Sequence, residues 1–140
     1  MVQLLNHIKL PAKIENLKRW TQSVLECARA QKFEGKRIQE IELALEEALV
    51  NICHYSYPEK PGEVEINCKL DGRHFIIEII DSGIPFDITS LSEPDRTADV
   101  DERKIGGLGV FLIKRMMDEV RYRRENDRNI LNLIIKMEKG

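Results

Sequence analysis

The sequence predicts an α+β fold, a two-layer sandwich in which a mixed sheet of about five strands is covered on one face by three helices. Two observations predict it. Apolar residues recur at helical spacing in three segments and alternate with polar residues in five others. The segments follow the order β-α-α-β-β-α-β-β, in which the second and third strands, and the last two, are joined as hairpins.

The first half of the chain is predicted to form one strand and two helices. Residues 4–10 form the strand, which Pro11 ends. Apolar residues at helical spacing predict the first helix over residues 13–30, and a polar turn containing a glycine follows it. Prolines mark the end of the second helix. The core stripe of this second helix consists of Ile38, Ile41, Leu45, Ala48, Leu49 and Ile52.

The second half is predicted to contain four strands and the third helix. Residues 64–70 and 75–80 have strand patterns, and Asp71-Gly72 between them is a strong signal for a two-residue hairpin. Residues 82–106 show little periodicity, and a structureless segment of that length is either disordered or a functional lid. The remaining elements are the third helix and a final hairpin, over residues 110–117, 120–124 and 130–136.

Composition favours one soluble, cytoplasmic domain over residues 1–140, because a chain of 140 residues is too short for two independent cores. The net charge of −2 gives no electrostatic footprint for nucleic acid or a membrane. No apolar run is long enough for a membrane span, and the N-terminus lacks the layout of a signal peptide. The three cysteines are far apart, which favours reduced thiols over disulfides or a zinc site.

On the second predicted helix, Glu47 and Asn51 are one turn apart and lie beside the core stripe, at the border with solvent. The amide can supply a neutral oxygen to Mg²⁺, which needs few protein ligands. A carboxylate one turn earlier can polarise a hydroxyl in line with a γ-phosphate. The alternative is that Glu42, Glu46 and Glu47 form a solvated helix face.

Two further segments have patterns that suit a nucleotide. Asp81 follows a strand, and its carboxylate can accept a hydrogen bond from an exocyclic amine while Gly83 lets a base approach the backbone. An ordinary turn that ends a strand is the alternative for this segment. A glycine cluster directly before the third helix can bind phosphate through backbone N–H groups, with nearby cations as clamps, or it can be a flexible hinge. These residues are Gly106, Gly107, Gly109, Arg103 and Lys104.

In combination, these motifs resemble those of the GHKL ATPase superfamily, whose Bergerat fold binds ATP under a mobile lid. The matching motifs are Glu47-xxx-Asn51 (the N box), Asp81-Ser-Gly83 (the first glycine box) and Gly107-Leu-Gly109 (the second). Within the superfamily, the chain looks most like the single-domain anti-sigma-factor serine kinases. That likeness runs over essentially the whole chain, through the segments Glu46-Glu-Ala-Leu-Val-Asn51, Gly106-Gly-Leu-Gly-Val-Phe-Leu-Ile-Lys-Arg-Met-Met-Asp118-Glu-Val120 and Arg128-Asn-Ile-Leu.

The resemblance implies a role for each matching residue. Glu47 would be the general base that activates a serine hydroxyl of a protein substrate, and Asn51 would ligate the Mg²⁺ that bridges the ATP phosphates. Asp81 would bind the adenine amine, with room for the ring at Gly83. Residues 82–106 would comprise the first glycine-box loop and the ATP lid, with the lid itself over residues 86–105. The phosphate contacts would be Gly107 and Gly109, with Arg103 or Lys104 at the γ-phosphate.

The sequence departs from the family pattern at two places. In the best-known relatives the lid arginine stands closer to the second glycine box, where this chain has Ile105. Many relatives also carry a histidine four residues after the N-box asparagine, where this chain has Tyr55. His54 lies one position earlier, which makes it a helix-end packing or surface residue.

By this resemblance, the protein is an ATP-dependent protein-serine kinase that binds and inhibits a sigma factor. It would phosphorylate a STAS-type anti-anti-sigma protein on serine, and a homodimer is expected from the family. The alternative is a nucleotide-dependent binding module that switches partners without phosphorylating any. The retained Glu47 argues against this alternative, because a pure binder needs a pocket but no base. A scaffold with chance glycine boxes is a third interpretation.

Overall fold

The computed structural model describes the backbone of residues 1–90 and 108–137, and the side chains of residues 1–90 and 109–137. Its strands and α-helices begin and end within a few residues of the predicted ones. The elements are β1 (Val2–Pro11), η1 (Ile14–Asn16), α1 (Leu17–Ala30), α2 (Lys36–Tyr55), β2 (Glu63–Asp71), β3 (His74–Asp81), η2 (Ile88–Ser90), α4 (Leu108–Met116), β4 (Glu119–Glu125) and β5 (Arg128–Lys136).

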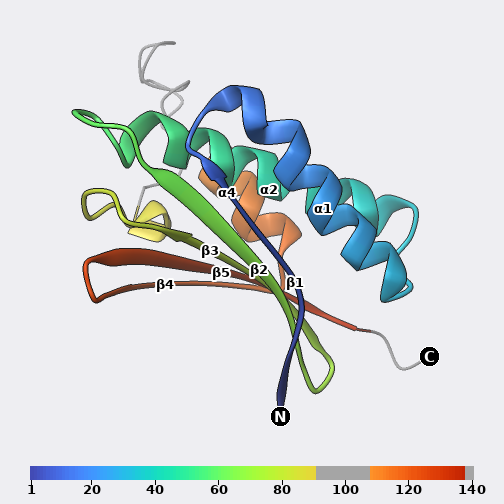
Figure 1. Cartoon of the computed structure of the whole chain (residues 1–140). Coiled ribbons are helices and arrows are strands. Elements are labelled where there is room, and N and C mark those ends of the chain that lie inside the picture. The colour runs from blue at the N-terminus through green and yellow to red at the C-terminus, as the bar shows by residue number, and fades with distance from the viewer. Residues whose placement is uncertain (91–107, 138–140) are drawn as a thin grey trace.

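The two-layer α+β architecture is confirmed. Five strands form one sheet in the order β1-β2-β3-β5-β4, and α1, α2 and α4 lie together on one face of it (Figure 1). Of the described helices, none is long and apolar enough to cross a membrane.

The expectation of a mixed sheet is wrong, because all four strand pairs are antiparallel. Two helices connect β1 to β2, so the chain returns to the end of the sheet where β1 finishes, and Pro11 pairs with Glu63. The connection from β3 to β4 through α4 makes these two strands run in the same direction, but β5 lies between them. No described strand therefore has a parallel neighbour.

The core lies between the helices and the inner face of the sheet. Trp20 of α1 is fully buried, and its indole N–H donates to the carbonyl oxygen of Val64 at 3.3 Å, which ties the helix layer to β2. The largest fully buried side chains come from both layers, so the apolar stripes predicted from the sequence do meet. They include Trp20, Phe75, Ile41, Leu45, Leu49, Ile66, Ile77, Ile79, Ile113, Leu133 and Ile135.

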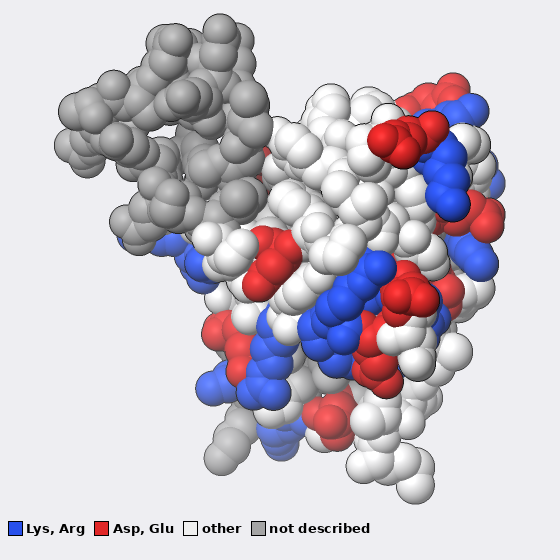
Figure 2. Space-filling view, turned by 90° about the vertical axis from the view of Figure 1, so that its left-hand side faces the viewer, with Lys and Arg blue, Asp and Glu red and all other residues white. Residues whose placement is uncertain are grey.

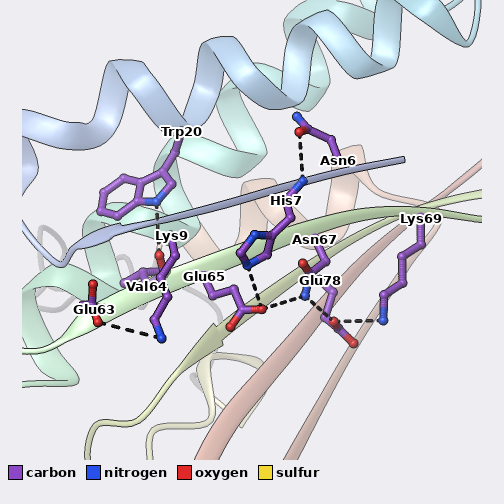
Figure 3. A network of polar contacts seen from close by, with 10 residues as sticks. All are labelled: Asn6, His7, Lys9, Trp20, Glu63, Val64, Glu65, Asn67, Lys69 and Glu78. Carbon is purple, nitrogen blue, oxygen red and sulfur yellow. Dashed lines mark hydrogen bonds and ion pairs between the residues drawn. The ribbon is translucent and has the colours of Figure 1, made fainter. Parts of the chain in front are cut away.

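The outer face of the sheet carries a polar network (Figure 3). The Asn67 amide donates to Glu65 at 3.2 Å and to Glu78 at 3.0 Å, and the Lys69 ammonium pairs with Glu78 at 3.0 Å. Burial by itself would raise the pKa of Glu78, but the bonds from Lys69 and Asn67 outweigh it, so the pKa is lowered. Side chains alternate between the two faces of the sheet along β2 and β3, so these polar ones lie on the face that no described helix covers.

Both predicted hairpins are present, but the first turn is shifted by one residue. Asp71 is the last residue of β2 and pairs with His74, so the loop consists of residues 72 and 73. Gly72 has a φ of 61°, which a glycine adopts without steric cost. In the second hairpin the positive φ angles fall on Asn126 and Asp127, two residue types that tolerate them.

A polar contact fixes the C-terminal end of α4. The Arg37 guanidinium, at the start of α2, donates to the carbonyl oxygen of Met116 and pairs with the Asp118 carboxylate at 2.9 Å. Asp118 in turn accepts the backbone N–H of Lys136 at 2.7 Å. Because a cation at a helix C-terminus satisfies free carbonyl groups, Arg37 anchors α4 between α2 and the sheet.

Candidate functional site

The helix α2 places Glu47 and Asn51 one turn apart, as predicted. Asn51 is buried, with 5% of its surface exposed, whereas Glu47 is half-buried. The Asn51 amide nitrogen donates to the backbone carbonyl oxygen of Glu47 at 2.7 Å. This bond orients the side chain, because with the nitrogen turned back to the helix the amide oxygen is left to accept from a donor or to bind a cation.

The helix α4 packs against this part of α2 through Gly109. A Cβ at Gly109 would lie 2.5 Å from Oε2 of Glu47 and 3.6 Å from the amide nitrogen of Asn51. Only a residue without a side chain leaves the Glu47 carboxylate where it is. The structure thus brings Gly109 against Glu47 and Asn51, which precede it by about sixty positions in the sequence.

Asp81 ends β3 and is buried, with 3% of its surface exposed. Its Oδ1 accepts the Gly83 N–H and the Asn129 amide, both at 2.9 Å. The hydrogen bonds from Gly83 and Asn129 both end on Oδ1, so neither of them occupies Oδ2. Burial raises the pKa of Asp81, while the hydrogen bonds from Asn129 and Gly83, the neighbouring Ser56 hydroxyl and the charge of Arg124 act in the opposite direction.

Gly83 lies against the end of α2. A Cβ there would be 2.0 Å from the backbone oxygen of Ser56, and this oxygen accepts the Ile84 N–H at 2.8 Å. The close approach joins the segment after β3 to the last turn of the helix that carries Glu47. The segment after Asp81 therefore lies beside the end of α2, the helix that carries Glu47 and Asn51.

A buried hydroxyl shows that this site is short of a polar partner. Ser56 is fully buried, and its Oγ has no hydrogen-bond partner among the described residues, although its proximity lowers the pKa of Asp81. A buried hydroxyl without a partner costs roughly 1–3 kcal/mol. The unpaired Ser56 hydroxyl, the open Oδ2 of Asp81 and the missing side chain at Gly83 together fit a polar ligand or an ordered water beside a planar base.

Several polar residues of the site were not predicted. The Tyr57 hydroxyl accepts the Ser82 N–H and donates to the Glu63 carbonyl oxygen, both at 2.7 Å, so it fixes the segment after Asp81. Asn129 pairs with Asp81 across β3 and β5. The sequence resemblance included the Arg128-Asn-Ile-Leu segment, but only the strand register shows that Asn129 faces the site.

The other predicted site residues lie outside the described part of the chain. They are Arg103, Lys104, Gly106 and Gly107, together with the part of the lid over residues 91–105. His54 is exposed, and its ring lies 6.2 Å from that of Tyr55, in agreement with a surface position. The described residues hold no cluster of three His, Cys, Asp or Glu side chains that could bind a metal.

The end of the molecule where β3 finishes carries charges of both signs, interspersed and not gathered by sign (Figure 2). This distribution agrees with the net charge of −2.

Comparison with known proteins agrees with this geometry. Residues 10–135 match the family described as "Histidine kinase-like ATPase domain". The serine-protein kinases RsbW of Bacillus thuringiensis (strain Al Hakam) and Bacillus anthracis are each 27% identical over 128 residues, which cover 89% of this chain and 80% of theirs. A chain in the crystal structure of the SiaB–SiaC complex from Pseudomonas aeruginosa has a similar fold, with a TM-score of 0.58 at 16% identity, covering 94% of this chain and 91% of that one. The protein belongs to the histidine kinase-like ATPase domain family, and the resemblance of its motifs to the GHKL ATPases and anti-sigma serine kinases is confirmed.

Proposed function

We propose that the protein is an ATP-dependent protein-serine kinase that also sequesters a sigma factor and phosphorylates a STAS-type anti-anti-sigma protein. One observation carries the proposal: the start of α4 lies against Glu47 and Asn51, through a glycine whose Cβ would touch both. A helix start is suited to phosphate, so a carboxylate and an amide oxygen at that place are suited to phosphoryl transfer.

At the base end of the site, the open Oδ2 of Asp81 accepts the adenine amine, and Gly83 leaves room for the ring. The unpaired Ser56 hydroxyl completes this end, either directly or through an ordered water. Buried polar groups without partners discriminate strongly between ligands, because a ligand that fails to pair with them leaves their desolvation uncompensated.

At the phosphate end, Asn51 would hold Mg²⁺ through its amide oxygen, and Glu47 would accept the proton of the attacking serine hydroxyl. A magnesium ion held by Asn51 would supply positive charge that offsets the charge of the phosphates. Gly107 and Gly109 bind phosphates through the backbone, and Arg103 or Lys104 contacts the γ-phosphate. Residues 86–105 act as the lid.

The named relatives support the kinase part of the proposal, because the similar RsbW proteins are serine-protein kinases. The structural neighbour comes from a complex of two proteins, which supports a function in partner binding. The sigma factor, the STAS protein and a homodimer are parts of the proposal that rest on the sequence resemblance alone.

The test uses labelled ATP, Mg²⁺ and STAS-domain proteins from the same genome as acceptors. We expect phosphate on a serine of one acceptor, and we expect Glu47→Gln to abolish transfer while nucleotide affinity stays within about twofold. Glu46→Gln is the matched control, since Glu46 is its half-buried neighbour on α2. ATP binding without transfer to any acceptor would favour the alternative of a binding module, and transfer by Glu47→Gln at the normal rate would refute the assignment of the base.

A further inference from the structure

Asn129 is the most densely hydrogen-bonded side chain near the candidate site. Asn129 is 97% buried. It is the second residue of β5 and pairs with Asp81 of β3. The amide nitrogen donates to Oδ1 of Asp81 at 2.9 Å and to the carbonyl oxygen of Ile84 at 2.7 Å. Both of its N–H groups are therefore used by the segment that contains the first glycine box.

The amide oxygen is equally committed. It accepts the Tyr122 hydroxyl at 2.6 Å, the Phe86 N–H at 3.2 Å and the Arg124 guanidinium at 3.2 Å. A flipped amide would present its nitrogen to these three donors and its oxygen to the Asp81 carboxylate, so only one orientation satisfies the surroundings. Since every polar atom of Asn129 is paired, the side chain has nothing left with which to contact a ligand directly.

We propose that Asn129 is a positioning residue for recognition of the nucleotide base: its amide occupies Oδ1 of Asp81 and so leaves Oδ2 as the acceptor for the exocyclic amine. This inference rests on the proposed function, because it concerns the base end of the same site. It assigns the selectivity for an amino-purine to a pair of side chains on neighbouring strands, where Asp81 makes the contact and Asn129 sets its direction.

Two side chains of β4 complete the arrangement. Arg124 donates to the carbonyl oxygen of Gly83 at 2.8 Å as well as to Asn129, and its charge favours the ionised form of Asp81. Tyr122 holds the amide oxygen from the same strand. A carboxylate with one oxygen occupied by an amide and a backbone N–H can rotate only by breaking both bonds, so the direction of the other oxygen is set before a ligand arrives.

The test replaces Asn129 and measures how the protein binds ATP and GTP, which carry an amine and a carbonyl oxygen at the same place of the purine. Asn129→Ala removes the donors, and Asn129→Asp keeps the shape but places a second acceptor against Asp81. We expect both variants to lose roughly tenfold or more in ATP affinity, with little change for GTP, because a hydrogen bond to a charged group is lost.

The controls are Asn132→Ala and Asn132→Asp on the same strand. Asn132 is half-buried and pairs with Glu78 on the outer face of the sheet, so its replacement should leave the ratio of ATP to GTP affinity unchanged. Unfolding curves of all four variants separate a general loss of stability from a loss of selectivity, because only the latter changes the ratio.

A second measurement is independent of nucleotide binding. Titration of the Asp81 carboxyl by NMR in the protein without nucleotide should show a higher pKa in Asn129→Ala than in the wild type and in Asn132→Ala. An unchanged ratio of affinities, or an unchanged pKa, would overturn the inference. A wild-type protein that binds neither nucleotide would instead refute the proposed function and its selectivity claim, and the titration would then show only whether Asn129 holds Asp81.

Discussion

Replacing Gly109 by alanine should separate catalysis from stability. The added methyl carbon would lie 2.5 Å from Oε2 of Glu47, and ordinary contact begins at 3.4 Å, so the carboxylate must retreat by about 0.9 Å. A misplacement of about 1 Å in a catalytic group costs on the order of 100-fold in rate. The carboxylate is the far end of a flexible side chain, and alanine favours a helix over glycine by up to about 1 kcal/mol.

We therefore expect Gly109→Ala to unfold at the same or a slightly higher urea concentration than the wild type, while single-turnover phosphate transfer from ATP falls roughly 100-fold. Gly83→Ala is the contrasting control. Its methyl carbon would meet the backbone oxygen of Ser56 at 2.0 Å, which cannot move away, so this variant should lose about 2 kcal/mol or more of stability. Transfer at the wild-type rate, or a loss of stability as large as that of Gly83→Ala, would refute the reasoning.

Three further outcomes follow from individual contacts. Because burial raises the pKa of Asp81, the wild type loses stability as pH rises above the ordinary pKa of a carboxyl. In urea unfolding, the stability of Asp81→Asn relative to the wild type should therefore increase from acid to neutral pH, and a relative stability that falls over this range would contradict the reasoning. Lys69→Met should destabilise the protein by about 1–3 kcal/mol at pH 7, and the effect should vanish in acid once Glu78 is protonated, since the lowered pKa of Glu78 gives stability only above it. Arg37→Ala should cost about 1–2 kcal/mol and speed amide exchange in α4 more than in α1; equal protection of both helices would show that the anchor has no effect.

Much of the fold could be predicted because its elements are defined locally. Apolar periodicity depends on neighbours within a few residues, and the strands and helices begin and end close to where that pattern starts and stops. Whether neighbouring strands are parallel or antiparallel depends instead on how many elements separate two strands along the chain, and on which strand lies between them in the sheet. The insertion of β5 between β3 and β4 is such a long-range event, and no local pattern indicated it.

The candidate site shows the same difference between local patterns, which could be predicted, and long-range contacts, which could not. Glu47, Asn51, Asp81 and Gly83 belong to short motifs, and the structure places Gly83 against the end of the helix that carries Glu47 and Asn51. Asn129 could not be found in this way, since an asparagine in a strand has the same pattern whether it faces solvent or a carboxylate. Its position became clear only when the register placed it opposite Asp81.

The return of the chain through two helices before β2 pairs with β1 has a consequence for folding. Val2 pairs with Asp71 and Pro11 with Glu63, so β1 cannot dock until more than fifty intervening residues are in place, whereas the two hairpins need only short loops. The candidate site draws on α2, β3, α4 and β5, and hence on contacts that are mostly non-local. A ligand held by all four elements has no site on a partly folded chain, so it shifts the folding equilibrium toward the native state by mass action and protects the slow-forming sheet.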